Sequence, residues 1–97
     1  MSQSKTILVI GTYDTKEEEL HYVADCIRGQ GGAVMSMDVS VLGAPSRPTD
    51  ISKHQVAEAG GSTIQVAIDS EDENTAMQIM ARGAALLCTQ LHATGQI

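Results

Sequence analysis

The stretch Lys5-Thr6-Ile7-Leu8-Val9-Ile10-Gly11-Thr12-Tyr13-Asp14-Thr15-Lys16 decides the fold of this chain of 97 residues. Its first half is a β-branched, apolar run ended by Gly11, which is typical of a strand buried on both faces in a parallel sheet. A short polar loop follows. From about Lys16 the pattern becomes helical, with an apolar face made of Leu20, Val23, Ala24 and Ile27.

Local signals predict how this first helix begins and ends. Asp14 or Thr15 is expected to cap it, and Thr15 with Glu18 has the spacing of a capping box. The glycines at 29, 31 and 32 are expected to stop it.

Further along, the pattern predicts a second strand over residues 33–39, a short helix over 53–59 capped by Asp50 or Ser52, and a long helix over 75–93. Residues 62–68 are ambiguous. Their β-branched composition favours a strand, whereas Ser62 and Gln65 have capping-box spacing, and we favour a helical turn.

These elements predict the α/β class, with a partial Rossmann-like parallel sheet and flanking helices. Two parallel strands are too few for an independently stable sheet. We therefore expect residues 1–97 to be the N-terminal part of a larger nucleotide-binding α/β domain whose remainder is absent from this chain, or a chain whose sheet a partner completes. A self-sufficient α+β minidomain is the open alternative.

Composition excludes several classes of function. Hydrophobic residues make up 42% and charged residues 19%, as in ordinary globular domains. The net charge is −6, with 6 basic residues and neither Trp nor Phe, so no nucleic-acid partner is expected. No apolar run, including the one at residues 7–10, approaches the length needed to cross a bilayer, so no membrane span is expected. A secretory signal is also lacking at the start, and Cys26 and Cys88 fit a reducing compartment, so we expect a cytoplasmic protein.

The turn between the first strand and the first helix is the main candidate site. Ligands of open parallel sheets bind at the carboxyl ends of the strands, and a helix N-terminus there suits a phosphate or carboxylate. An ordinary capped turn explains the same residues, and neither a Walker A loop nor a dinucleotide fingerprint is present. The candidate residues of this loop are Gly11, Thr12, Asp14, Thr15 and Lys16.

Asp38 is a second candidate, because it ends the second strand at the same edge of the sheet. It is placed either to accept hydrogen bonds from a ribose or to bind loop amides. The three histidines are dispersed and no metal-ligand spacing occurs, so no catalytic residue is assigned and no metal site is expected.

Four segments resemble one known family. These are Ile7–Glu19 with its Gly-Thr-Tyr-Asp-Thr-Lys loop, Met37–Gly43, Asp50–Ser52 with Val56-Ala57, and Met80–Ala85. They resemble, in order, the N-terminal part of the tomato mosaic virus resistance protein and its bacterial relatives, long regarded as uncharacterised. That part of the family is described as an ATP-binding domain.

The resemblance implies that Asp14, Thr15 and Lys16 contact ATP, possibly with Mg²⁺, and that Asp38, Val39 and Ser40 lie beside it. It also implies a second glycine-rich phosphate loop beyond residue 97. Glu73 stands where the family often has an Arg that faces the phosphates.

Three functions are compared. The first is an ATP-binding or other nucleotide-binding N-terminal subdomain of a larger cytoplasmic protein. The second is an assembly module with no ligand of its own, which forms a homo-oligomer or binds the remainder of its own domain. The third is an enzyme acting on small metabolites, for which these residues supply no convincing general base.

Overall fold

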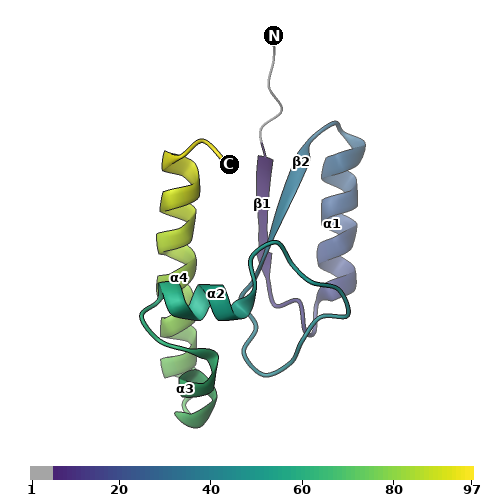
Figure 1. The fold of residues 1–97 in the computed structure, drawn as a ribbon. Helices are drawn as coiled ribbons and strands as arrows, with labels where there is room; N and C mark the ends of the chain where they lie inside the picture. Colours follow the sequence, from purple (N-terminus) through teal and green to yellow (C-terminus); the bar gives the residue numbers. More distant parts are fainter. Residues whose placement is uncertain (1–5) are drawn as a thin grey trace.

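The computed structural model describes residues 6–97 and has the α/β architecture that the sequence predicts (Figure 1). Its two strands pair in parallel, in a register that runs from Thr6 opposite Ala33 to Gly11 opposite Asp38. The elements in chain order are β1 (Thr6–Gly11), α1 (Glu17–Gly29), β2 (Ala33–Asp38), α2 (Lys53–Ala59), α3 (Ile64–Asp69) and α4 (Glu73–Ala93).

Most of the predicted elements are confirmed, with ends displaced by one or two residues. The ambiguous segment is helical, as favoured, but Thr63 caps it instead of Ser62. Ser52 caps α2 in the expected capping box with Gln55. Asp50 instead accepts hydrogen bonds from the backbone N–H and the hydroxyl of Ser36. Lys5, expected at the start of β1, lies outside the described residues.

The helices lie on both sides of the sheet, with α1 on one side and α2 and α4 on the other (Figure 1). Met37 is fully buried in the larger core, to which α2, α3 and α4 also contribute residues, and Leu8 and Met35 pack against this core. Val9 is buried as well, and its carbonyl accepts a hydrogen bond from the hydroxyl of Tyr13. Val23, predicted on the apolar face of α1, is 45% exposed because two strands cover only part of that face.

The crossing of α2 and α4 depends on two glycines. A Cβ atom added to Gly83 would overlap the carbonyl oxygen of Val56, and one added to Gly60 would overlap the carbonyl oxygen of Ile79. The guanidinium of Arg82 also donates to the Gly60 carbonyl, at 3.3 Å from Nη1. Backbone atoms of the two helices are therefore in direct contact, which fixes α4 against α2 and, through α2, against β2.

The outer edge of β2 is partly covered by the loop that leads into α2. Ile51 forms a parallel bridge with Met37, accepting from Asp38 N and donating to Ser36 O. Within residues 6–97, no helix has both the length and the hydropathy needed to cross a membrane.

Candidate functional site

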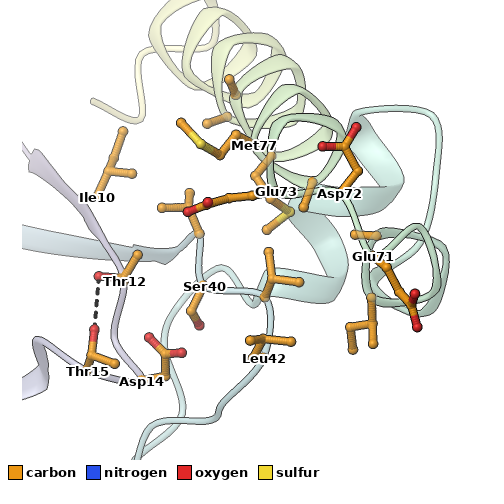
Figure 2. A pocket seen from close by; sticks show the side chains of 18 residues that line it. Ile10, Thr12, Asp14, Thr15, Ser40, Leu42, Glu71, Asp72, Glu73 and Met77 are labelled. Atoms are coloured by element: carbon orange, nitrogen blue, oxygen red, sulfur yellow. Dashed lines mark hydrogen bonds between the residues drawn. The ribbon is translucent and has the colours of Figure 1, made fainter.

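A pocket of about 780 Å³ opens at the carboxyl ends of the two strands, between the loops that follow them and helices α3 and α4 (Figure 2). It has a polar end next to the β1–α1 loop and an apolar wall along α4. Five predicted site residues line it, namely Thr12, Asp14, Thr15, Val39 and Ser40. Gly11, Lys16 and Asp38 are not among its lining residues.

The β1–α1 loop is a compact turn closed by its own backbone. The carbonyl of Thr12 accepts hydrogen bonds from the amides of Thr15 at 3.2 Å and Lys16 at 2.9 Å. The predicted cap by Asp14 or Thr15 is wrong. Lys16 is the N-cap residue, and within residues 6–97 no side chain caps the helix. The backbone bonds of the turn end on the amides of Thr15 and Lys16, which precede the helix, and not on the amides of its first turn.

The N-terminus of α1 therefore keeps free donors. In an α-helix the first amides have no partner within the helix, and within residues 6–97 no side chain accepts from those of Glu17, Glu18 and Glu19. The Lys16 ammonium lies 3.7 Å from a carboxylate oxygen of Glu19, with both side chains about two-thirds exposed. An ion pair this exposed is weak and leaves Lys16 available to an anion.

Gly11 permits the close approach of α1 to β1. A Cβ atom at this position would lie 2.6 Å from a terminal carbon of Leu20. Its role in the site is thus to bring the helix N-terminus to the end of the strand.

Asp38 joins the two loops behind the pocket. Its carboxylate is buried, and Oδ1 accepts from the amide of Tyr13 at 3.3 Å, the amide of Ser40 at 2.9 Å and the hydroxyl of Ser40 at 2.6 Å. Burial, and then the negative charge of Asp38, raise the pKa of Tyr13. Of the two roles considered for Asp38, the geometry displays the binding of loop amides, and a ribose contact stays a prediction.

Two further carboxylates hold the loop after β2 against the β1–α1 loop and the start of α1. Asp14 accepts from the amide of Gly43 at 3.2 Å. Glu17 accepts from the amide and hydroxyl of Ser46 and from the amide of Arg47, and it lies 3.4 Å from His21. These bonds, led by the Ser46 amide, lower the pKa of Glu17 to about 2.

Lys53 completes this arrangement from the start of α2. Its ammonium donates to the carbonyls of Gly43 at 2.6 Å and Val41 at 3.1 Å. The loop that forms one wall of the pocket is therefore held at both ends.

The side of the pocket formed by the α3–α4 turn is acidic. Glu71, Asp72 and Glu73 all line it, and no Lys or Arg of residues 6–97 does. Asp72 caps α4 by accepting from the amide of Asn74 and the hydroxyl of Thr75. Glu73 extends from α4 across the pocket toward the ends of the strands (Figure 2). Among the residues described, no three His, Cys, Asp or Glu side chains gather closely enough to hold a metal ion together.

Comparison with known sequences identifies the family. Residues 5–97 match the domain described as "Uncharacterised protein family (UPF0261) N-terminal domain". The chain belongs to this family. It is 50% identical over 96 residues to a UPF0261 protein of Brucella suis biovar 1, a match that covers 99% of this chain and 23% of that relative.

Other UPF0261 relatives match over similar segments. One from Clostridium tetani is 36% identical over 88 residues, covering 91% of this chain and 22% of the relative. One from Rhizobium meliloti is 37% identical over 81 residues, a match that covers 84% of this chain and 20% of the relative. The chain thus spans about a quarter of the length of the curated relatives it matches. No solved structure matches it.

Sequence reasoning missed the residues that surround the predicted ones. The apolar wall includes Ile10, Met77, Ala81 and Ala84, which the sequence placed in a strand and a helix without bringing them together. Glu17 and Lys53 position the loop, but their partners lie 29 and 10 residues away, at Ser46 and Gly43. Spacing along the sequence carries no signal for such contacts.

Proposed function

We propose that this UPF0261 domain contributes one half of a nucleotide-binding site, with ATP as the ligand. The observation that carries the proposal is the polar end of the pocket, where Thr12, Asp14, Thr15 and Ser40 come together at the carboxyl ends of two parallel strands (Figure 2). This is where nucleotides bind to open α/β sheets. The resemblance of the Gly11–Lys16 loop to an ATP-binding family supports the same ligand.

The phosphates would face α1. The uncapped amides of its first turn, the dipole of the helix and the exposed ammonium of Lys16 together favour an anionic group. The hydroxyls of Thr12 and Thr15 lie 3.5 Å apart, where both can donate to a phosphate oxygen.

The nucleoside would face α4. Glu73 repels phosphate but accepts hydrogen bonds from ribose hydroxyls or from an exocyclic amine. Mg²⁺ commonly binds through one or two carboxylates together with substrate phosphates. Asp14, at the polar end of the pocket, could supply one such carboxylate. The metal would arrive already bound to the ATP phosphates.

The test is an amide NMR titration of the ¹⁵N-labelled chain with Mg-ATP, because half a site is expected to bind weakly. Signals of residues 12–18 should shift and saturate. Lys16→Ala should weaken binding about tenfold, the worth of one charge-assisted hydrogen bond to phosphate.

Arg28→Ala is the matched control. It removes the same charge at the other end of α1, where Arg28 pairs with Asp25. Because the charge lies far from the phosphate site and is screened by salt, affinity for ATP should stay within about twofold. Shifts that are absent at millimolar ATP, or equal losses in both variants, would overturn the proposal.

A further inference from the structure

The edge of β1 that faces away from β2 is unpaired in residues 6–97. The carbonyl of Gly11 accepts from the amide of Val39 on the β2 side, and backbone groups alternate in direction along a strand. The backbone N–H and C=O groups of Ile7 and Val9 therefore also face β2. The corresponding groups of Thr6, Leu8 and Ile10 face the free edge. The structure gives these last three no backbone partner across that edge.

Both faces of the sheet are hollow beside this edge. On the α4 face, Ile10 is 41% exposed and lines the apolar wall of the main pocket with Met77, Ala81 and Ala84. On the α1 face, Ile7 is 45% exposed and lines a second groove with Cys26 and Ile27. A strand added at this edge would place alternate side chains into the two hollows.

We infer that the free edge of β1 binds a parallel strand from the segment that follows this domain in the longer UPF0261 proteins. Its residues would be apolar on both faces, since the pocket wall beside Ile10 and the groove beside Ile7 are both apolar. The strand order would then be β2, β1, added strand, with β1 in the centre.

Direction and length favour this occupant over a second copy of the chain. The strands pair in parallel, and Ile51 continues the parallel arrangement at the far edge. Helix α4 runs opposite to β1, and Ile97 packs against the core at the end of the sheet where β1 begins (Figure 1). A segment that follows Ile97 would therefore start at the end of the sheet where β1 starts and could run parallel to β1, with α4 as the crossover helix. The matched relatives are about four times as long as this chain. A two-fold pair of β1 edges would instead be antiparallel.

Hydrogen exchange tests the inference. The 97-residue chain is compared with the same chain followed by the part of the Brucella suis relative that lies beyond the match. In the short chain the amides of Leu8 and Ile10 should exchange much faster than those of Val9 and Gly11, which face β2. In the extended chain Leu8 and Ile10 should slow by at least about a hundredfold, since an edge amide becomes part of the cooperative core. Val9 serves as the internal reference.

A second measurement does not depend on the fusion. In the full-length Brucella suis protein, the amides aligned with Leu8 and Ile10 should be as protected as the amide aligned with Val9. Fast exchange there overturns the inference. Protection of the short chain that increases with its concentration would also overturn it, since that result means β1 pairs with a second copy. Neither result involves ATP, so each is separate from the titration of residues 12–18.

Discussion

The contact between α2 and α4 gives the sharpest prediction for stability. The substitution Gly83→Ala adds a single carbon atom, which would overlap the carbonyl oxygen of Val56 and lie 2.8 Å from its carbonyl carbon. Both neighbours are backbone atoms, so no side chain can rotate away. The two helices have to separate, and α2 is the element through which α4 is held near the sheet.

Two effects of opposite sign set the magnitude. Ala is favoured over Gly in a helix interior by about 1 kcal/mol. Overpacking a close contact costs typically about 1–3 kcal/mol, and a rigid backbone neighbour argues for the upper end. We expect a net loss of about 2 kcal/mol in the free energy of unfolding. For a domain of this size, that lowers the melting temperature by roughly 8–16 °C.

The assay is urea and thermal unfolding followed by circular dichroism, with Gly29→Ala as the matched control. Gly29 is the last residue of α1, and a Cβ atom there meets nothing within 4 Å. The same chemical change should leave stability unchanged or raise it by up to about 1 kcal/mol. A Gly83→Ala chain as stable as the Gly29→Ala chain would refute the close backbone contact.

Three other substitutions test the loops around the pocket. Asp38→Ala should cost about 1–3 kcal/mol of unfolding free energy, because the buried amides of Tyr13 and Ser40 lose their acceptor, whereas Asp38→Asn should recover part of the loss; equal losses in chemical denaturation would contradict this role. Glu17 has a pKa of about 2 in the folded chain against about 4.5 when unfolded, so its contribution is present above pH 4.5 and disappears as the pH falls toward 2. Glu17→Gln should therefore flatten the pH dependence of stability between pH 5 and pH 2, measured by urea unfolding at each pH, and an unchanged slope would count against the bonds to Ser46 and Arg47. Gly11→Ala should destabilise by about 1 kcal/mol through Leu20, and Leu20→Ala should remove most of that coupling in a double-mutant cycle.

The elements of this fold could be predicted because their signals are local. The run from Thr6 to Ile10 and the helical spacing that begins near Leu20 each depend on neighbours within a few residues. The same holds for the capping box at Ser52. The cap of α1 could not be predicted this way, because the turn at Thr12 closes through backbone bonds that any sequence can make.

The sequence predicts where the candidate site lies, but not which side chains contact one another there. The edge of the sheet follows from the parallel order of β1 and β2, and five of the eight predicted residues line the pocket there. The contacts made by each side chain depend on segments far away in the sequence. Asp38 meets Tyr13, 25 residues earlier, and Gly83 meets Val56 through the crossing of two helices, and neither pairing has a local signal.

The free edge of β1 lies next to the proposed nucleotide site, so a strand added at that edge would also change the site. A strand that pairs with Leu8 and Ile10 in the direction of β1 has its carboxyl end beside Thr12, at the polar end of the pocket. Its side chains would cover the apolar wall, while the loop after it would face the uncapped amides of α1. Glu73 makes one side of the pocket acidic, and the nearby ammonium of Lys53 is already bound to the carbonyls of Val41 and Gly43. The exposed ammonium of Lys16, at the start of α1, is therefore the cation that this half offers to a phosphate. ATP carries several negative charges, so tight binding requires further donors or cations. The added loop is the nearest element that could supply them, and affinity for ATP should rise in the extended chain in which the amide of Leu8 becomes protected.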